Sequence, residues 1–316
     1  MEQSITHEMF LIQSLKAEIG NIIIGQDYMI DRILIGLLTG GHILLEGVPG
    51  LAKTLTASTL AAATGLDFNR IQFTPDLLPA DIIGTEIYHQ KTGEFNIKKG
   101  AIFSHFILAD EINRAPAKVQ SALLEAMEEK QVTIGDQTYL LEKPFIVVAT
   151  QNPLEQHGTY PLPEAQQDRF MMKLKVEYPT RDEERLILQR FTGENKALPL
   201  IKSVITAKDI MAMREQVQNV HVDDHILEYV LDIIGKSRIN SDYIECGASP
   251  RGSLNLIKAA KGIAFIEGRN YLIPDDIKAV AYDVLRHRLS LSYEAEAEDY
   301  TSESMIKEIL EAVKLP

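Results

Sequence analysis

The stretch His42-Ile43-Leu44-Leu45-Glu46-Gly47-Val48-Pro49-Gly50-Leu51-Ala52-Lys53-Thr54-Leu55 decides the fold of this chain. Its apolar beginning predicts a strand, its glycines a loop, and the residues from Lys53 onward a helix. Backbone N–H groups at the start of such a helix face phosphate oxygens, and the helix dipole favours negative charge there. We therefore expect a phosphate-binding loop in this stretch.

The loop follows the pattern G-x-x-x-x-G-K-[ST] at Gly47, Lys53 and Thr54, with Ala52 in place of the second glycine and an additional Gly50. Lys53 would bring positive charge to the β- and γ-phosphates of a nucleotide, and Thr54 would offer its hydroxyl to Mg²⁺. A tight turn with a solvated lysine is the alternative for the loop taken alone. The residues expected to contact the nucleotide are Gly47, Val48, Pro49, Gly50, Leu51, Ala52, Lys53, Thr54 and Leu55.

Length and composition indicate a globular protein of two domains. The chain has 316 residues, 45% of them hydrophobic and 24% charged, which is ordinary for such proteins. No apolar stretch approaches the roughly 20 residues that cross a bilayer, and residues 1–7 lack a basic segment followed by an apolar one. We therefore expect a cytoplasmic protein without a membrane span. The single cysteine, Cys246, fits a reducing compartment.

The net charge of −13 argues against binding to nucleic acid. Binding to a phosphate backbone would need a local basic patch on such an acidic chain. Lys91, Lys98 and Lys99 form a small basic cluster on a predicted hairpin, and charge at such a place ordinarily serves solubility. Nucleic acid is therefore not an expected partner.

Two adjacent acids follow the short apolar strand 107–109. Ligands of open α/β sheets lie at the carboxyl ends of strands, so Asp110 and Glu111 would face a bound nucleotide. Asp110 would hold Mg²⁺ directly or through water, and Glu111 would polarise the water that attacks the γ-phosphorus. An acid pair at a strand end is common on protein surfaces, but its place after a phosphate loop favours catalysis.

Two further polar residues flank later strands. Asn152 follows the apolar strand 145–149 and could orient the attacking water or sense the γ-phosphate, although an asparagine before proline also forms ordinary turns. Arg169 precedes a fifth strand at 171–176 and is a candidate for an arginine that acts on a neighbouring subunit. The alternative is that Arg169 is an ordinary surface arginine. Arg114 is the competing candidate for the arginine that acts on a neighbouring subunit, called the arginine finger.

Strands and helices alternate up to about residue 178. Hairpins are expected at about 85–98 and 131–142, and an N-terminal helix at about 8–17. Beyond residue 178 the pattern is helical throughout. The predicted helices span about 181–191, 207–217, 223–237, 250–267, 274–287 and 302–313. We accordingly expect a nucleotide-binding domain at 1–178 and a helical domain at 179–316.

Together these segments resemble an AAA+ ATPase of the MoxR family. The similar segments are Gly-Val-Pro-Gly-Leu-Ala-Lys-Thr at 47–54, Leu-Ala-Asp-Glu-Ile-Asn-Arg-Ala at 108–115, Ala-Thr-Gln-Asn-Pro at 149–153, Leu-Pro-Glu-Ala-Gln-Gln-Asp-Arg-Phe at 162–170 and Gly-Ala-Ser-Pro-Arg-Gly at 247–252. They match the family's Walker A, Walker B, sensor 1, arginine-finger and sensor 2 motifs in order. The resemblance covers nearly the whole chain.

The resemblance implies a P-loop NTPase fold: an αβα sandwich with a five-stranded, mostly parallel sheet of strand order 5-1-4-3-2, followed by an all-α lid. ATP and Mg²⁺ would bind between the two domains. Arg251 would reach from the lid to the γ-phosphate, and Gly25 and Gln26 would lie on the adenine side. The two hairpins match the helix-2 insert and the pre-sensor 1 hairpin.

The resemblance also implies an ATP-hydrolysing homo-hexameric ring that acts as a chaperone-like remodeller or a metal-insertion helper of a protein client. That client could be a protein with a von Willebrand factor A domain. A DNA-directed motor and a nucleotide-gated assembly scaffold are the alternatives.

Overall fold

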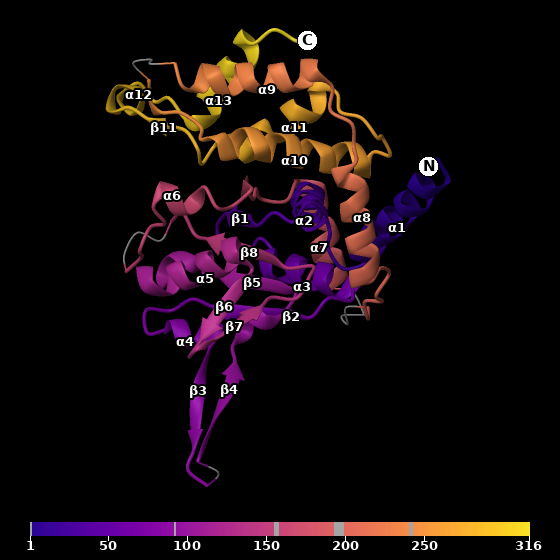
Figure 1. Ribbon diagram of the computed structural model, residues 1–316. Helices are drawn as coiled ribbons and strands as arrows, with labels where there is room; N and C mark the ends of the chain where they lie inside the picture. The colour runs from indigo at the N-terminus through magenta and orange to yellow at the C-terminus, as the bar shows by residue number, and fades with distance from the viewer. Residues whose placement is uncertain (1, 92, 155–157, 193–198, 240–242) are drawn as a thin grey trace.

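A computed structural model describes residues 2–91, 93–154, 158–192, 199–239 and 243–316. Thr92, which belongs to the predicted hairpin turn, lies outside these residues. Figure 1 shows an α/β body that carries a mostly helical layer, with one long hairpin extending from the opposite end. No helix in the described ranges is long and apolar enough to span a bilayer.

Five parallel strands form the central sheet. They are β1 (Ile43–Glu46), β2 (Phe68–Gln72), β5 (Phe106–Asp110), β8 (Ile146–Gln151) and β9 (Met172–Lys175). Their order is β2-β5-β8-β1-β9, and every neighbouring pair is parallel. The predicted order 5-1-4-3-2 is thus confirmed.

The strands are apolar on both faces because each face packs against helices. On β1, Ile43 and Leu45 belong to one buried cluster and Leu44 to the other. The first cluster includes residues of α1 (Glu2–Gly20), α2 (Asp27–Thr39) and α3 (Lys53–Ala63), whereas the second includes residues of α5 (Ala117–Glu129). This division of alternate residues produces the αβα sandwich.

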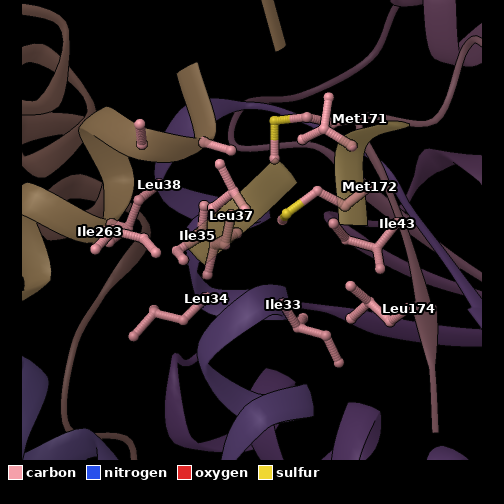
Figure 2. Packing of buried hydrophobic residues seen from close by; sticks show 14 of the residues in the cluster. Ile33, Leu34, Ile35, Leu37, Leu38, Ile43, Met171, Met172, Leu174 and Ile263 are labelled. Carbon is pink, nitrogen blue, oxygen red and sulfur yellow. The ribbon is translucent and has the colours of Figure 1, made fainter. Parts of the chain in front are cut away.

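Helix α2 joins the sheet to the helical layer. Its side chains Leu34 and Leu37 are almost fully buried and share a cluster with Ile43 and with Ile263 of α10 (Pro250–Ile266). Figure 2 shows these groups together with Met171 and Met172. A Cβ added at Gly262 of α10 would lie 2.8 Å from Ile35. The Ile35 side chain of α2 therefore packs directly on this glycine, where a larger residue would not fit.

The remaining helices confirm most of the predicted pattern. They are α7 (Arg181–Thr192), α8 (Ala207–Gln218), α9 (Asp224–Ser237), α11 (Pro274–Leu285), α12 (Tyr293–Ala297) and α13 (Ser302–Ala312), with the short α4 (Pro79–Ile83) and α6 (Glu164–Gln167). Helix α1 is longer than expected at both ends. The hairpins are β3 (Gly84–His89) with β4 (Glu94–Lys99) and β6 (Gln131–Ile134) with β7 (Gln137–Leu140).

The expectation that only helices follow residue 178 is wrong at one place. Strands β10 (Ile244–Cys246) and β11 (Ser290–Leu291) pair in antiparallel fashion, with Ile244 opposite Leu291. Segments of two and three residues are too short to show an alternating pattern, so their pairing depends on the helices that bring them together. Helices α7 and α8 lie beside the α/β body, and α9 to α13 form the layer above it (Figure 1). The domain boundary at 178 stays a prediction.

His42 fixes the start of β1 from inside the core. Its Nδ1 accepts a hydrogen bond from the Val147 backbone N–H at 3.0 Å, and its Nε2 lies 3.2 Å from the Met127 carbonyl oxygen. Since Nδ1 accepts, the proton of the neutral ring sits on Nε2 and is donated to Met127. Desolvation by burial lowers the pKa of His42 to about 4, below the usual value of about 6.5.

This lowered pKa predicts acid sensitivity. The unfolded chain binds the proton more readily between pH 6.5 and pH 4, so the free energy of unfolding falls as the pH drops through this range, by about 2 kcal/mol from this residue at pH 5. Urea unfolding of wild type and His42→Asn at pH 7 and pH 5 measures the effect. The stability difference between the two proteins should shrink at pH 5, and an equal difference at both pH values would contradict this account.

Candidate active site

The predicted site lies at the carboxyl edge of the sheet. The loop after β1, the end of β5 and the residues after β8 meet there because the strands are parallel. They enclose a cavity of about 490 Å³. Its lining residues are Ile22, Ile23, Ile24, Pro49, Gly50, Leu51, Ala52, Lys53, Thr54, Leu55, Asp110, Glu111, Thr150, Asn152, Ile187, Arg190 and Phe191.

The phosphate loop has the backbone conformation that its motif requires. Ala52, which replaces the second glycine, has φ +56°, and Gly50 has φ +88°. Alanine tolerates this left-handed conformation at a cost of roughly 1–2 kcal/mol. At Gly47 an added Cβ would lie 3.0 Å from Val176, so a side chain would crowd this turn. Helix α3 then begins at Lys53, and the residues of its first turn, Lys53–Leu55, line the cavity.

Lys53 lies at the edge of the cavity with its charge still available. Its Nζ donates a hydrogen bond to the Gly47 carbonyl oxygen of the same loop. Partial burial lowers the pKa of Lys53, and the charges of Asp110 and Glu111 counteract this shift. A carbonyl is a weaker partner for an ammonium group than a phosphate oxygen. A triphosphate can therefore displace it.

Asp110 and Thr54, the predicted ligands of Mg²⁺, bring oxygen atoms close together. The Thr54 hydroxyl lies 3.4 Å from Asp110 Oδ2, and the Thr150 hydroxyl donates to Asp110 Oδ1 at 2.6 Å. Mg²⁺ is usually held by one or two protein oxygens together with substrate phosphates and water. The described residues contain no group of three or more His, Cys, Asp or Glu side chains that could hold a metal ion.

Asp110 also has a cationic partner that the sequence analysis missed. Arg70 of β2 donates to Asp110 Oδ2 from Nη2 at 2.7 Å and from Nε at 3.0 Å. The contact neutralises the acid on the oxygen that faces Thr54. A metal ion at this oxygen would compete with the Arg70 guanidinium.

Glu111 faces the cavity from a left-handed backbone conformation, with φ +56°. Its N–H donates to the Thr150 hydroxyl at 2.9 Å, so Thr150 connects both acids. Its carboxylate accepts a hydrogen bond from Gln72 Nε2 at 2.7 Å and lies 3.2 Å from Arg114 Nε. Arg114, the competing finger, thus pairs with the acid of its own subunit.

Asn152 lies at the cavity and also forms a turn. It is buried and lines the cavity, and its Oδ1 accepts a hydrogen bond from the Leu154 N–H at 3.1 Å. The hydrogen bond to Leu154 belongs to the ordinary turn that asparagine forms before proline. A contact of its side chain with the γ-phosphate stays a prediction.

Gly25 and Gln26 lie next to the cavity wall rather than in it. Gln26 donates to the Glu177 carbonyl at 3.2 Å, and a Cβ at Gly25 would clash with Glu183 of α7. The wall itself consists of Ile22–Ile24 and of α7, whose Arg190 donates to the Ile22 carbonyl at 2.6 Å. The sequence has no motif at Ile22–Ile24 or in α7. The two segments lie far apart in the chain and meet only in the tertiary fold.

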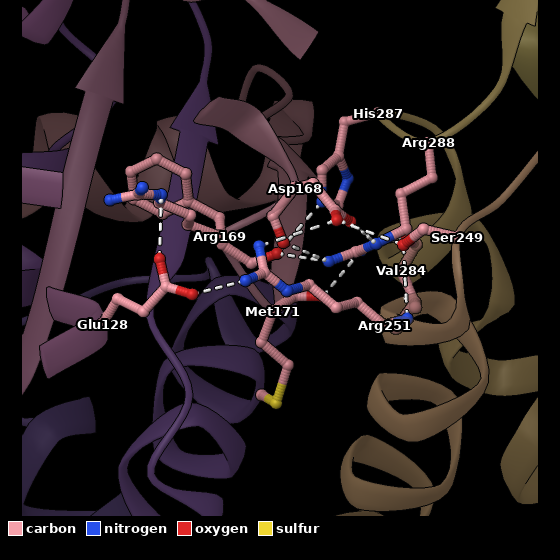
Figure 3. A network of polar contacts seen from close by, with 10 residues as sticks. Glu128, Asp168, Arg169, Met171, Ser249, Arg251, Val284, His287 and Arg288 are labelled. Carbon is pink, nitrogen blue, oxygen red and sulfur yellow. Dashed lines mark hydrogen bonds and ion pairs between the residues drawn. The ribbon is translucent and has the colours of Figure 1, made fainter. Parts of the chain in front are cut away.

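Arg169 and Arg251 lie together, but at a different place. They line a second cavity of about 260 Å³, with Glu128 and Asp168. Figure 3 shows both guanidinium groups at Glu128. In the described part of the chain, neither arginine lines the cavity of its own phosphate loop. Helix α7 also walls that cavity, whereas the layer α9 to α13 contributes no lining residue to it.

Comparisons with known proteins agree with this geometry. Residues 42–172 match the family model "ATPase family associated with various cellular activities (AAA)", and residues 236–309 match "AAA lid domain". The chain is 46% identical to Chaperone MoxR1 of Mycobacterium tuberculosis over 99% of its length and 85% of the relative. It is 30% identical to Protein MoxR of Paracoccus denitrificans, over 92% of each.

A solved crystal structure from Cytophaga hutchinsonii superposes with a TM-score of 0.93 at 50% sequence identity, covering 100% of this chain and 98% of the other. This agreement extends over both the α/β body and the helical layer. The described arrangement is therefore shared with an experimentally determined structure.

Loss of the Lys53 ammonium should weaken nucleotide binding. Lys53→Ala removes the charge nearest the β- and γ-phosphates, so the Kd for ATP should rise at least about tenfold, or about 1.4 kcal/mol. Titration with a fluorescent ATP analogue measures this. Lys307→Ala, at an exposed lysine of α13, is the control and should bind normally. Equal affinities in the two variants would contradict the phosphate-loop assignment.

Proposed function

Because the chain belongs to the MoxR family of AAA ATPases, we propose that it works as a homo-hexameric ring in which each ATP is completed by two arginines of the neighbouring subunit. One observation carries the proposal. Arg169 and Arg251 lie side by side at Glu128, away from the phosphate loop of their own chain. Arginines so placed can serve hydrolysis from across an interface, as trans-acting arginine fingers do.

Within one subunit, the cavity supplies the remaining groups for ATP hydrolysis. The N–H groups of the phosphate loop and Lys53 would bind the phosphates, and Thr54 and Asp110 would hold Mg²⁺, which neutralises charge on the phosphate oxygens. Glu111 would accept a proton from the attacking water. We propose that Ile22–Ile24 and α7 enclose the adenine base of the nucleotide.

Glu111 has to leave its present partners, Gln72 and Arg114, to act as the base. Gln72 donates to its carboxylate at 2.7 Å, which lowers the electron density available to a water proton. The neutral amide is the weaker of the two partners, and the Arg114 guanidinium at 3.2 Å is the charged one. We propose that nucleotide binding shifts Glu111 from Gln72 and Arg114 to the attacking water.

We propose further that the ring acts in the cytoplasm on a protein client. The name of a relative, Chaperone MoxR1, supports a chaperone-like role. The net charge of −13 disfavours a DNA-directed motor. A metal-insertion role and a client with a von Willebrand factor A domain rest on the family resemblance. The hairpin β3–β4 extends well away from the body (Figure 1) and offers a surface for such a client.

Replacement of Glu111 tests the chemical step. Glu111→Gln keeps the size of the side chain but removes the base, so ATP should bind normally while its hydrolysis slows at least about a hundredfold. Steady-state phosphate release measures the rate, and the fluorescent analogue measures binding. Turnover close to wild type would reassign the base, with Asp110 the next candidate.

Replacement of Arg169 tests the interface. Arg169→Ala should bind ATP normally and hydrolyse it slowly at every protein concentration, whereas turnover per wild-type subunit should rise with concentration. Mixing Arg169→Ala with Lys53→Ala subunits should restore some activity, because an interface can then pair an intact phosphate loop with an intact finger. Phosphate release from the mixture decides, with co-assembly monitored by light scattering.

Absence of recovery in a mixture that has co-assembled would mean that Arg169 serves only its own subunit. Arg114→Ala, mixed with Lys53→Ala in the same way, is the comparison. Because Arg114 pairs with Glu111 of its own chain, this second mixture should stay inactive. Recovery in it, without recovery for Arg169, would make Arg114 the finger.

A further inference from the structure

Glu128 connects the two arginines that the proposed function places at the interface. It lies in the last turn of α5 and presents one carboxylate oxygen to each guanidinium. Oε2 lies 3.2 Å from Arg169 Nε, and Oε1 accepts a hydrogen bond from Arg251 Nη2. Arg169 comes from the α/β body and Arg251 from the helical layer, so a single acid joins the two parts here (Figure 3).

The contact leaves the useful edge of Arg169 available. Within the described part of the chain, Arg169 meets Glu128 through Nε, which lies on the side of the guanidinium. The terminal edge, with Nη1 and Nη2, is the fork that binds phosphate oxygens in bidentate fashion. Glu128 thus pairs with the guanidinium from its Nε side.

Asp168, which lines the same cavity as Glu128, does not perform this task. Asp168 Oδ1 pairs with Arg288 Nε at 2.7 Å, and its Oδ2 accepts a hydrogen bond from the Ser249 hydroxyl at 3.1 Å. Asp168 Oδ2 also lies 3.8 Å from Arg251 Nη1, a longer contact than that of Glu128. Its charge is therefore mostly compensated by the buried Arg288, and Glu128 is the acid that pairs with both interface arginines.

From this geometry we propose that Glu128 is a positioning residue, which holds Arg169 and Arg251 side by side as one unit for the γ-phosphate of the neighbouring subunit. Two guanidinium groups repel each other unless an anion lies between them. Until the neighbour's phosphate arrives, Glu128 supplies that anion. The inference rests on the proposed function, since it requires the two arginines to act across an interface.

The effect should appear in catalysis rather than in stability. Glu128, Arg169 and Arg251 retain side-chain exposures of 38%, 31% and 46%, and ion pairs this exposed contribute little to folding. A finger without its fixed orientation, by contrast, loses much of its effect on rate. Glu128→Ala should therefore lower kcat about tenfold or more, with little change in ATP affinity or melting temperature. Glu128→Gln, which keeps the size but not the charge, should give an intermediate kcat.

Two mixing experiments with full-length subunits distinguish this role from one in the subunit's own site. Glu128→Ala mixed with Lys53→Ala should recover activity, because the first contributes an intact phosphate loop and the second an intact arginine unit. Glu128→Ala mixed with Arg169→Ala should not recover, since both lack the same unit. If Glu128 acted on its own nucleotide, the two results would be reversed.

Phosphate release at saturating ATP is the readout, and light scattering verifies assembly. Glu308→Ala, at an exposed acid of α13, is the control and should turn over like wild type. Wild-type turnover in Glu128→Ala, or the reversed mixing pattern, overturns this inference and leaves the proposed function standing. If mixed assemblies of Arg169→Ala and Lys53→Ala subunits show no recovery of activity, both this inference and the proposed function are overturned.

Discussion

Beside the apolar packing of α2, one buried guanidinium, that of Arg288, binds the segment before β9 to the helical layer. All five of its N–H donors have acceptors. Nε pairs with the Asp168 carboxylate, Nη2 donates to the carbonyls of Asp168 and Phe170, and Nη1 donates to those of Met171 and Val284. Burial lowers the pKa of Arg288 to about 10, and Asp168 opposes the shift. The group therefore stays charged at neutral pH, and its burial is compensated by complete hydrogen bonding.

This contact has a consequence for function, because the segment it holds carries Arg169. The backbone at Asp168, Phe170 and Met171 is bound to the helical layer, and His287 Nε2 adds a contact with the Phe170 carbonyl at 3.1 Å. The same layer presents Arg251 from the first turn of α10. Both arginines are thus mounted on a junction between the two parts of the chain. A movement of the helical layer would shift them together, and under the proposed function this movement would couple its position to hydrolysis in the adjoining subunit.

Elements that are encoded by neighbouring residues could be predicted from the sequence. Strand periodicity, the glycines of the phosphate loop and the acids after β5 predicted the sheet and its catalytic edge, because parallel strands bring their ends together whatever the helices do. Arg70, Gln72 and Arg190 were missed because they contact Asp110, Glu111 and Ile22 only through the tertiary fold. The resemblance named Arg169 and Arg251 but not their common partner, since Glu128 lies in an ordinary amphipathic helix. Likewise, β10 and β11 are too short to leave a pattern.

The charged groups of the phosphate-loop cavity share one property, which is that each already has a partner in the chain. Lys53 meets the Gly47 carbonyl, Asp110 meets Arg70, and Glu111 meets Gln72. An isolated buried charge would be costly, so a site that waits for a highly charged ligand needs such temporary partners. Binding of ATP with Mg²⁺ then replaces contacts instead of creating them from solvated groups, and its net free energy is the difference between two sets of contacts. On the proposed mechanism, Glu111 is the residue that has to be released for the chemical step, and its release breaks both the contact with the neutral Gln72 amide and the ion pair with Arg114.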